Sequence, residues 1–104
     1  MTSGGPAQRV LVVDDEPVLR SVLREILELD GYDVVEASGR ESALRACREG
    51  VIDVAILDVS LPSMPGPQLL ARLREIRPGL PAVFISGHPA SDVEGIGDEG
   101  FLQK

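Results

Sequence analysis

Three acidic side chains stand directly after two apolar segments of this chain. Asp14 and Asp15 follow the apolar segment 10–13, and Asp58 follows a second one at 54–57. In an open α/β fold, ligands bind beyond the carboxyl ends of the parallel strands, so the three carboxylates are expected in one pocket. Crowded carboxylates repel one another unless a cation neutralises them. Because every candidate ligand is oxygen, the pattern predicts a divalent metal site that favours Mg²⁺ over zinc or copper.

The elements that must position these acids follow from the alternation of apolar segments and helix signals. Strands are expected at 9–13, 33–36, 52–57, 82–86 and 100–103, and helices at 17–30, 38–49 and 66–77. Pro17 suits the start of the first helix, and Ser38 with Glu41 predicts a capping box at the start of the second. Alternating strands and helices favour parallel pairing with right-handed crossovers. The predicted fold class is therefore α/β, a flavodoxin-like, doubly wound sheet of five parallel strands.

Composition limits the class of protein and its partners. The chain has 104 residues, 43% of them apolar, with a formal net charge of −7, which disfavours nucleic acid and anionic lipid as partners. No segment is long enough to span a membrane, and no signal peptide is visible. Cys47 is the one cysteine, on the apolar face of the second helix, so we expect a buried thiol in a cytoplasmic protein. Residues 1–8 are expected to form a flexible leader to a single domain at 9–104.

Four short motifs lie at the predicted strand ends: LVVDDEP at 11–17, ILDVSLPSMPG at 56–66, FISG at 84–87 and FLQK at 101–104. Together they resemble the receiver domain of two-component response regulators. Each motif alone is a weak signal, but the four in this order are specific. The resemblance covers the chain from Arg9 to its end. It implies a phosphorelay signalling domain that takes a phosphoryl group from a histidine kinase or a histidine phosphotransfer protein, and not an enzyme that turns over other substrates.

The resemblance also implies a role for each matching residue around the acidic pocket. Asp58 would be the phosphoacceptor and would form an aspartyl phosphate. Asp14, Asp15 and Asp58 would ligate Mg²⁺, together with the backbone carbonyl of Ser60. Lys104 would pair with the resting carboxylate and afterwards with the phosphoryl oxygens, so that catalysis is mainly positioning and electrostatics.

Four positions would act once the phosphoryl group is in place. The hydroxyl of Ser86 would donate to a new phosphoryl oxygen, and Phe101 would turn inward as the neighbouring loop moves. By the same resemblance, His88 and Ser60 occupy the two positions that, in such domains, tune the attack of water on the acyl phosphate. Other interpretations stay open, because Ser86 also suits a turn, Phe101 a plain core position and His88 a solvated loop.

The acids themselves leave alternatives open. Asp14 and Asp15 suit an acidic pair ahead of a helix N-terminus, and Asp58 suits a turn. A Mg²⁺-dependent phosphatase resembling the haloacid dehalogenase group would need two acids spaced two apart after the first strand, and here they are adjacent. An interaction module that is never phosphorylated is the other alternative.

The end of the chain departs from the resemblance. Members of that family continue beyond the position of Lys104 with a proline and a fifth helix, so we expect a C-terminally truncated receiver domain with the fifth helix missing. Apolar surface on the later strands would then be open to water. The glycine-rich segment 87–100 predicts at most a short helix near 91–95. An effector domain or a homodimer partner would have to supply the output.

Overall fold

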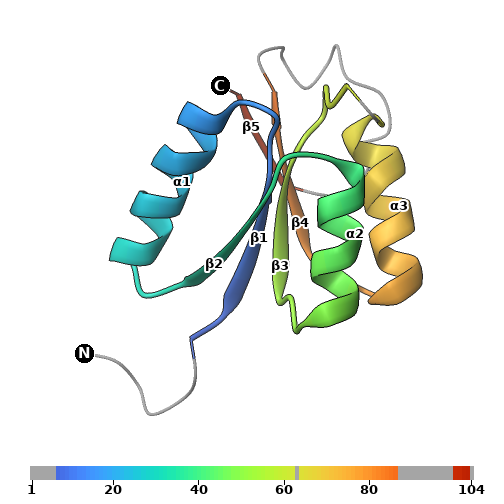
Figure 1. The fold of residues 1–104 in the computed structure, drawn as a ribbon, viewed down its shortest axis with the longest axis horizontal. Helices are drawn as coiled ribbons and strands as arrows, with labels where there is room; N and C mark the ends of the chain where they lie inside the picture. Colours follow the sequence, from blue (N-terminus) through green and yellow to red (C-terminus); the bar gives the residue numbers. More distant parts are fainter. Residues whose placement is uncertain (1–6, 63, 87–99, 104) are drawn as a thin grey trace.

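The strands and helices alternate along the chain, as the sequence predicts. The computed structural model describes residues 7–62, 64–86 and 100–103, and the fold below is that of these residues. In order, the elements are β1 (Arg9–Val13), α1 (Pro17–Leu29), β2 (Asp33–Ala37), α2 (Arg40–Glu49), β3 (Val54–Asp58), α3 (Gly66–Ile76), β4 (Ala82–Ser86) and β5 (Gly100–Gln103) (Figure 1). All neighbouring strands are parallel in the sheet order β2-β1-β3-β4-β5. This arrangement confirms the predicted flavodoxin-like, doubly wound sheet.

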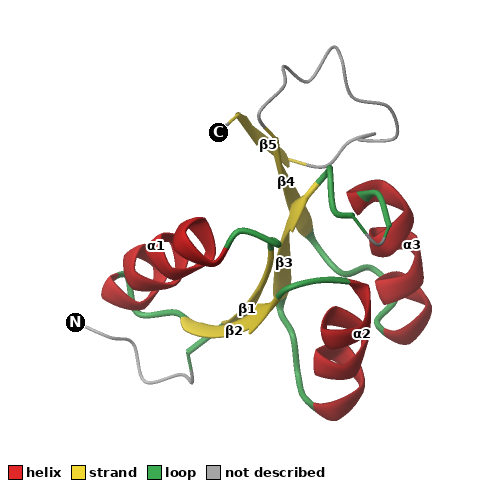
Figure 2. Cartoon of the chain, turned by 45° about the horizontal axis from the view of Figure 1, so that its top comes forward, coloured by secondary structure: helices red, strands yellow, loops and turns green. Residues whose placement is uncertain are grey.

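The helices cover the two faces of the sheet unequally. Figure 2 shows α2 and α3 side by side on one face and α1 on the other. The larger hydrophobic core lies under α2 and α3. Its fully buried side chains include Leu11, Leu57, Leu69, Leu73 and Phe84. The core on the opposite face is smaller, with three buried valines from β1 and β2.

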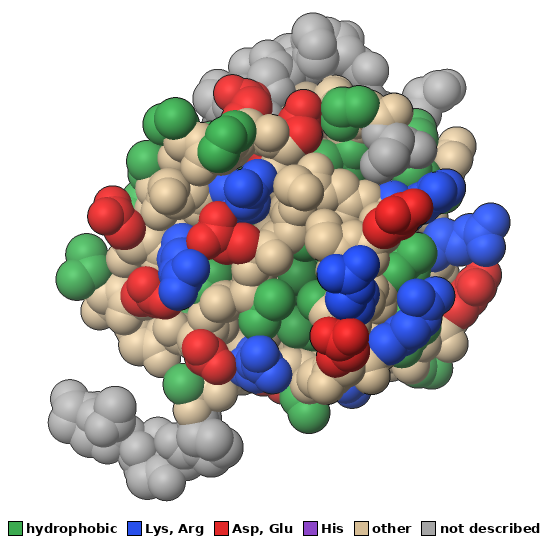
Figure 3. All heavy atoms as spheres, viewed as in Figure 1, with side chains coloured by type: hydrophobic (Ala, Val, Ile, Leu, Met, Phe, Trp, Pro, Cys, Tyr) green, Lys and Arg blue, Asp and Glu red, His purple; other side chains and the backbone are tan. Residues whose placement is uncertain are grey.

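The α1 face of the sheet stays partly open. Among the described residues, α1 has no buried side chain, and Leu27 is only partly buried against the sheet. On its outer side α1 carries exposed apolar side chains, and Figure 3 shows such side chains on this part of the surface. They are Val18, Val22, Ile26 and Leu29. Val54, Ile56 and Val83 of the sheet line a groove of about 390 Å³ beside Leu27.

The start of α2 differs from the predicted capping box. The helix begins at Arg40, and the residue before it, Gly39, has an extended backbone. The hydroxyl of Ser42 accepts hydrogen bonds from the amides of Ser38 and Gly39 at 3.1 and 3.4 Å. The prediction that Glu41 closes a box with Ser38 is therefore wrong, because a shorter side chain one residue later reaches the same free amides.

The third strand is displaced toward the acidic pocket relative to its predicted bounds. It begins at Val54, two residues later than expected, and extends one residue further to include Asp58. Just before it, a carboxylate oxygen of Asp53 accepts a hydrogen bond from the amide of Arg9 at 2.8 Å. This side-chain contact takes a backbone donor of β1, and regular pairing begins one residue further along.

Cys47 is buried in the larger core, as the sequence predicts. Burial raises the pKa of its thiol, and the charge of Arg77 opposes that effect only in part. The thiol therefore stays protonated near neutral pH and behaves as a small apolar side chain. No helix among the described residues has the length and apolar character that crossing a membrane requires. The segment 91–95, for which a short helix was predicted, lies outside those residues.

Candidate metal and phosphoacceptor site

The three predicted acids meet at the carboxyl edge of the sheet. The register pairs Val13 of β1 with Leu57 of β3, so the loop after β1 lies beside the end of β3. One carboxylate oxygen from each of Asp14, Asp15 and Asp58 lies within 4.8 Å of the other two. The strand order reverses between β1 and β3, and open α/β sheets bind ligands at such a point.

Burial divides the three carboxylates into two kinds. Asp14 is fully buried and Asp58 is 3% exposed, whereas Asp15 faces solvent. Two carboxylates held out of water beside a third are costly unless a cation offsets their charge. The donors are all oxygen atoms, and the exposed side leaves room for the waters that Mg²⁺ retains. The residues present therefore fit a hard divalent cation.

Both buried aspartates are oriented by the same local contact. The amide of Glu16 donates to Oδ1 of Asp14 at 2.8 Å, and the amide of Ser60 donates to Oδ1 of Asp58 at 3.0 Å. In each case the carboxylate accepts a hydrogen bond from the amide two residues further along, which fixes the side chain at a turn. The amide of Val59 also donates to the carbonyl of the neighbouring strand at 3.1 Å, which anchors the end of β3.

Gly66, the first residue of α3, lies close against the backbone of Asp58 and Val59. Its amide donates to the carbonyl of Val59 at 3.0 Å. A Cβ at this position would lie 2.6 Å from the carbonyl oxygen of Asp58 and 2.9 Å from the Cα of Val59. Glycine therefore lets α3 begin directly against the strand that carries Asp58. Sequence reasoning took Gly66 only as a helix opener, although it closes the motif that begins at 56.

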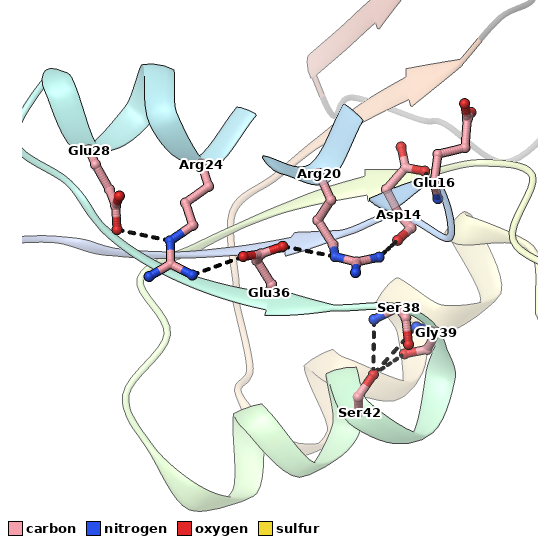
Figure 4. A network of polar contacts seen from close by, with 9 residues as sticks. All are labelled: Asp14, Glu16, Arg20, Arg24, Glu28, Glu36, Ser38, Gly39 and Ser42. Atoms are coloured by element: carbon pink, nitrogen blue, oxygen red, sulfur yellow. Dashed lines mark hydrogen bonds and ion pairs between the residues drawn. The ribbon is translucent and has the colours of Figure 1, made fainter. Parts of the chain in front are cut away.

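A chain of ion pairs ties α1 and β2 to the acidic loop (Figure 4). Nη1 of Arg20 donates to the backbone carbonyl of Asp14 at 2.7 Å, and its Nε donates to Glu36 at 2.9 Å. Arg24 bonds the other oxygen of Glu36 at 2.9 Å and also pairs with Glu28. Hydrogen bonds from Arg24 and then Arg20 lower the pKa of Glu36 below its ordinary value. The sequence analysis missed Arg20, because its partners lie on other elements.

The predicted switch residues occupy the far strands. Ser86 is fully buried at the end of β4, one residue beyond the partner of Asp58 in the register, Ile85. Phe101 on β5 is half-buried against the larger core and is paired with Phe84 of β4. Ser86 thus lies on the strand next to that of Asp58, and Phe101 lies one strand further from the acidic site.

The remaining predicted residues divide between the surface and the undescribed part of the chain. Ser60 is exposed two residues after the end of β3, and its amide donates to Asp58 as described above. Lys104 and His88 lie outside the described residues, so their predicted roles stay predictions.

Comparison with known proteins decides the family. The family model of the response regulator receiver domain matches residues 10–104. This chain belongs to that family. The resemblance inferred from the four motifs is confirmed, and the acidic site described above lies in a receiver domain of two-component systems.

The relatives of this receiver domain include proteins named as transcriptional regulators. The chain is 41% identical over 86 residues to the probable transcriptional regulatory protein TcrX of Mycobacterium tuberculosis, a match that covers 83% of this chain and 37% of TcrX. The chain thus spans less than half the length of the curated relatives it matches first.

Two solved structures show a close likeness in fold. The response regulator TrrA of Thermotoga maritima, in complex with Mg²⁺ and BeF, has a TM-score of 0.82 and 29% identity, covering 93% of this chain and 86% of that one. A response regulator of Burkholderia pseudomallei, with a phosphorylated aspartic acid, a calcium ion and citrate, has a TM-score of 0.82 and 27% identity. That match covers 93% of this chain and 59% of the other.

Proposed function

We propose that this receiver domain accepts a phosphoryl group on Asp58 from a histidine kinase or a histidine phosphotransfer protein. The observation that carries the proposal is the meeting of Asp14, Asp15 and Asp58 within 4.8 Å at the sheet edge. In this proposal the three acids and the backbone carbonyl of Ser60 bind Mg²⁺. The domain works in the cytoplasm. Mg²⁺, when bound, offsets the charge of the carboxylates and of the transferring phosphoryl group.

The chain's own residues orient Asp58 so that its carboxylate can attack the phosphorus atom of the donor. The Ser60 amide holds one carboxylate oxygen, which orients the other as the nucleophile. The new P–O bond to Asp58 forms as the P–N bond to the donor histidine breaks. The leaving ring nitrogen keeps the electron pair of that bond, so a donor protonated on its other ring nitrogen leaves as neutral imidazole. Near-complete burial of Asp58 limits the access of water to the acyl phosphate.

Lys104, Ser86 and Phe101 complete the proposed response. The charge of Lys104 offsets that of the phosphoryl oxygens, and the hydroxyl of Ser86 donates a hydrogen bond to one of them. Phe101 turns inward with the loop that follows Ser86. Ser60 and His88 set the rate at which water removes the phosphoryl group. Support for this scheme comes from two similar proteins, one solved with Mg²⁺ and BeF and one with a phosphorylated aspartic acid.

The exposed side of α1 supports a helical phosphodonor. The helix begins two residues after Asp15, and its outer apolar side chains run from Val18 through Val22 to Ile26. A partner helix packed along this stripe would present its side chains beside the acidic pocket. The proposed unit is a domain at 9–104 after a leader at 1–8, and its output would pass to an effector domain, as in the longer transcriptional regulators it matches, or to a homodimer partner.

Phosphorylation with a small donor tests the proposal. Intact-mass measurement after incubation with acetyl phosphate and Mg²⁺ should show one added phosphoryl group per chain, and none when the metal is chelated. Asp58→Asn should abolish the addition, whereas Asp30→Asn, a matched change on an exposed residue after α1, should leave it unchanged. Equal labelling of wild type and Asp58→Asn would refute the assignment. Sustained turnover of phosphate esters would instead favour the alternative of a Mg²⁺-dependent phosphatase. A complete lack of labelling would favour the alternative of an interaction module that is never phosphorylated.

A further inference from the structure

A groove between α2 and α3 carries a charge opposite to that of the chain as a whole. The chain has a net charge of −7, yet four arginines line this groove of about 600 Å³. They are Arg40, Arg45 and Arg48 of α2 and Arg72 of α3. Figure 3 shows the basic side chains gathered over α2 and α3, with acidic ones between them. Two acidic side chains, Glu41 and Glu49, line the same groove among the residues that the structure describes, fewer than the arginines.

Three of these guanidinium groups are available to a ligand. Arg45, Arg48 and Arg72 are exposed, and none of them takes part in an ion pair or side-chain hydrogen bond within the described part of the chain. On the other face of the sheet, by contrast, Arg20 and Arg24 are bound to Glu36. A free guanidinium presents donors in a planar fork that matches a carboxylate.

The floor of the groove is apolar. Leu44 of α2 and Met64, in the loop before α3, line it and pack against the larger core while remaining partly exposed. An occupant therefore needs apolar side chains on the side that faces the helices. It also needs acidic side chains at its edges to meet the arginines.

The lining favours a protein segment over a nucleic acid. Glu41 and Glu49 stand among the arginines, which disfavours a continuous phosphate backbone. No aromatic side chain lines the groove among the described residues, so bases would have nothing to stack on. Acidic residues outnumber basic ones in the chain as a whole, and its net negative charge would also repel a polyanion.

We propose that this groove docks an acidic amphipathic helix of a partner protein. The carboxylates of that helix pair with Arg45, Arg48 and Arg72, and its apolar face contacts Leu44 and Met64. This docking mode repeats the packing of an amphipathic helix into a groove between two helices. Attraction between the arginines and an acidic segment offsets the repulsion that the chain's overall charge imposes on it.

The groove also continues toward the acidic site. A neighbouring hollow shares Arg40 and Arg45 with the groove and extends to Asp15. A docked helix thus lies beside the edge of the sheet at which the three acids meet. The docking itself does not rest on phosphorylation of Asp58, so it is tested on the unmodified chain.

Amide NMR spectra of the 104-residue chain test the docking directly. The probe is a synthetic amphipathic peptide of about 20 residues, long enough to be helical, with leucines on one face and glutamates on the other. We expect it to shift the amide signals of α2 and α3 and to leave those of α1 in place. Arg48→Gln and Arg72→Gln should each weaken binding by about threefold, the size expected of an exposed ion pair. Arg24→Gln, with the same charge change on α1, should leave the affinity unchanged.

Four results would overturn the proposal. The first is equal affinity in the two groove variants and in the Arg24→Gln control. The second is a set of shifts centred on α1 or on β5. The third is equally tight binding of a lysine-for-glutamate analogue or of single-stranded DNA. The fourth is self-association of the chain that Arg72→Gln abolishes, which would make a second copy the occupant. Thermal unfolding of each variant shows that the exposed substitutions leave the fold intact.

Discussion

The two faces of the sheet differ in how completely helices cover them. Leu57 and Ile56 are neighbours in β3 and point to opposite faces. Leu57 is fully buried under α2 and α3, whereas Ile56 is only partly buried, because α1 is the one helix among the described elements that covers its side. Stability is therefore concentrated on the α2–α3 face. The α1 face keeps apolar side chains open to solvent beside the acidic site, where a partner can reach them.

The largest expected loss of stability comes from removing a side chain from the larger core. Leu57→Ala should lower the free energy of unfolding by about 3 kcal/mol, because it removes buried methyl groups and leaves a cavity. Ile56→Ala should cost about 1 kcal/mol, since its side chain is partly hydrated already. Urea unfolding of both variants measures the difference. Equal losses would show that the two faces contribute alike.

Gly66→Ala should have the next largest effect and lower the free energy of unfolding by about 2 kcal/mol. The added Cβ would meet the backbone of Asp58 and Val59 at distances that force α3 or the end of β3 to move. The same change should slow phosphorylation of Asp58, which intact mass against time would follow. Gln68→Ala, on the exposed side of the same helix, is the matched control. A Gly66→Ala protein as stable and as reactive as wild type would mean that the close approach is unimportant.

The ion-pair chain on the α1 face should contribute less and should depend on pH. Because the pKa of Glu36 is lowered in the folded state, its contribution is complete above the ordinary glutamate value of about 4.3 and is lost as the pH falls through the lowered value. Glu36→Gln should therefore destabilise the domain by under about 1 kcal/mol at neutral pH, discounted for solvent screening. The two proteins should converge in stability in acid. A difference that grows as the pH falls would contradict this sign.

The smallest effect is expected on the outer side of α1. Val18 is 77% exposed, so Val18→Ala should change the free energy of unfolding by less than about 0.5 kcal/mol. The same substitution should weaken phosphotransfer from a histidine-containing partner, if the stripe is the docking surface, while leaving acetyl phosphate labelling intact. A clear loss of stability would show that this side chain packs in solution.

The sequence alone predicted a doubly wound sheet of five parallel strands and the meeting of the acids. The meeting follows from apolar segments that end in aspartate, because parallel strands bring their carboxyl ends to one edge. It did not predict which side of α1 faces the sheet, since Val22 and Leu23 follow the same helical spacing. Only packing against β1 and β2 separates the partly buried Leu23 from the exposed Val22.

Contacts between distant residues were the other part that the sequence could not provide. The hydrogen bond from Arg20 to the carbonyl of Asp14 depends on where α1 crosses the sheet. The approach of Gly66 to Asp58 depends on the course of the loop between β3 and α3. At the start of α2, the amides of Ser38 and Gly39 donate to the hydroxyl of Ser42, a contact that the Ser38–Glu41 pattern did not predict.

The most direct test of the account is a titration with Mg²⁺ and beryllofluoride followed by amide NMR. If Asp14, Asp15 and Asp58 form the metal and phosphoacceptor site, both reagents together should shift the signals of the loop after β1 and of the residues around Asp58. Asp58→Asn should abolish the response, and Asp15→Asn should raise the Mg²⁺ concentration it requires. An unchanged wild-type spectrum, or the same response in Asp58→Asn, would contradict the account.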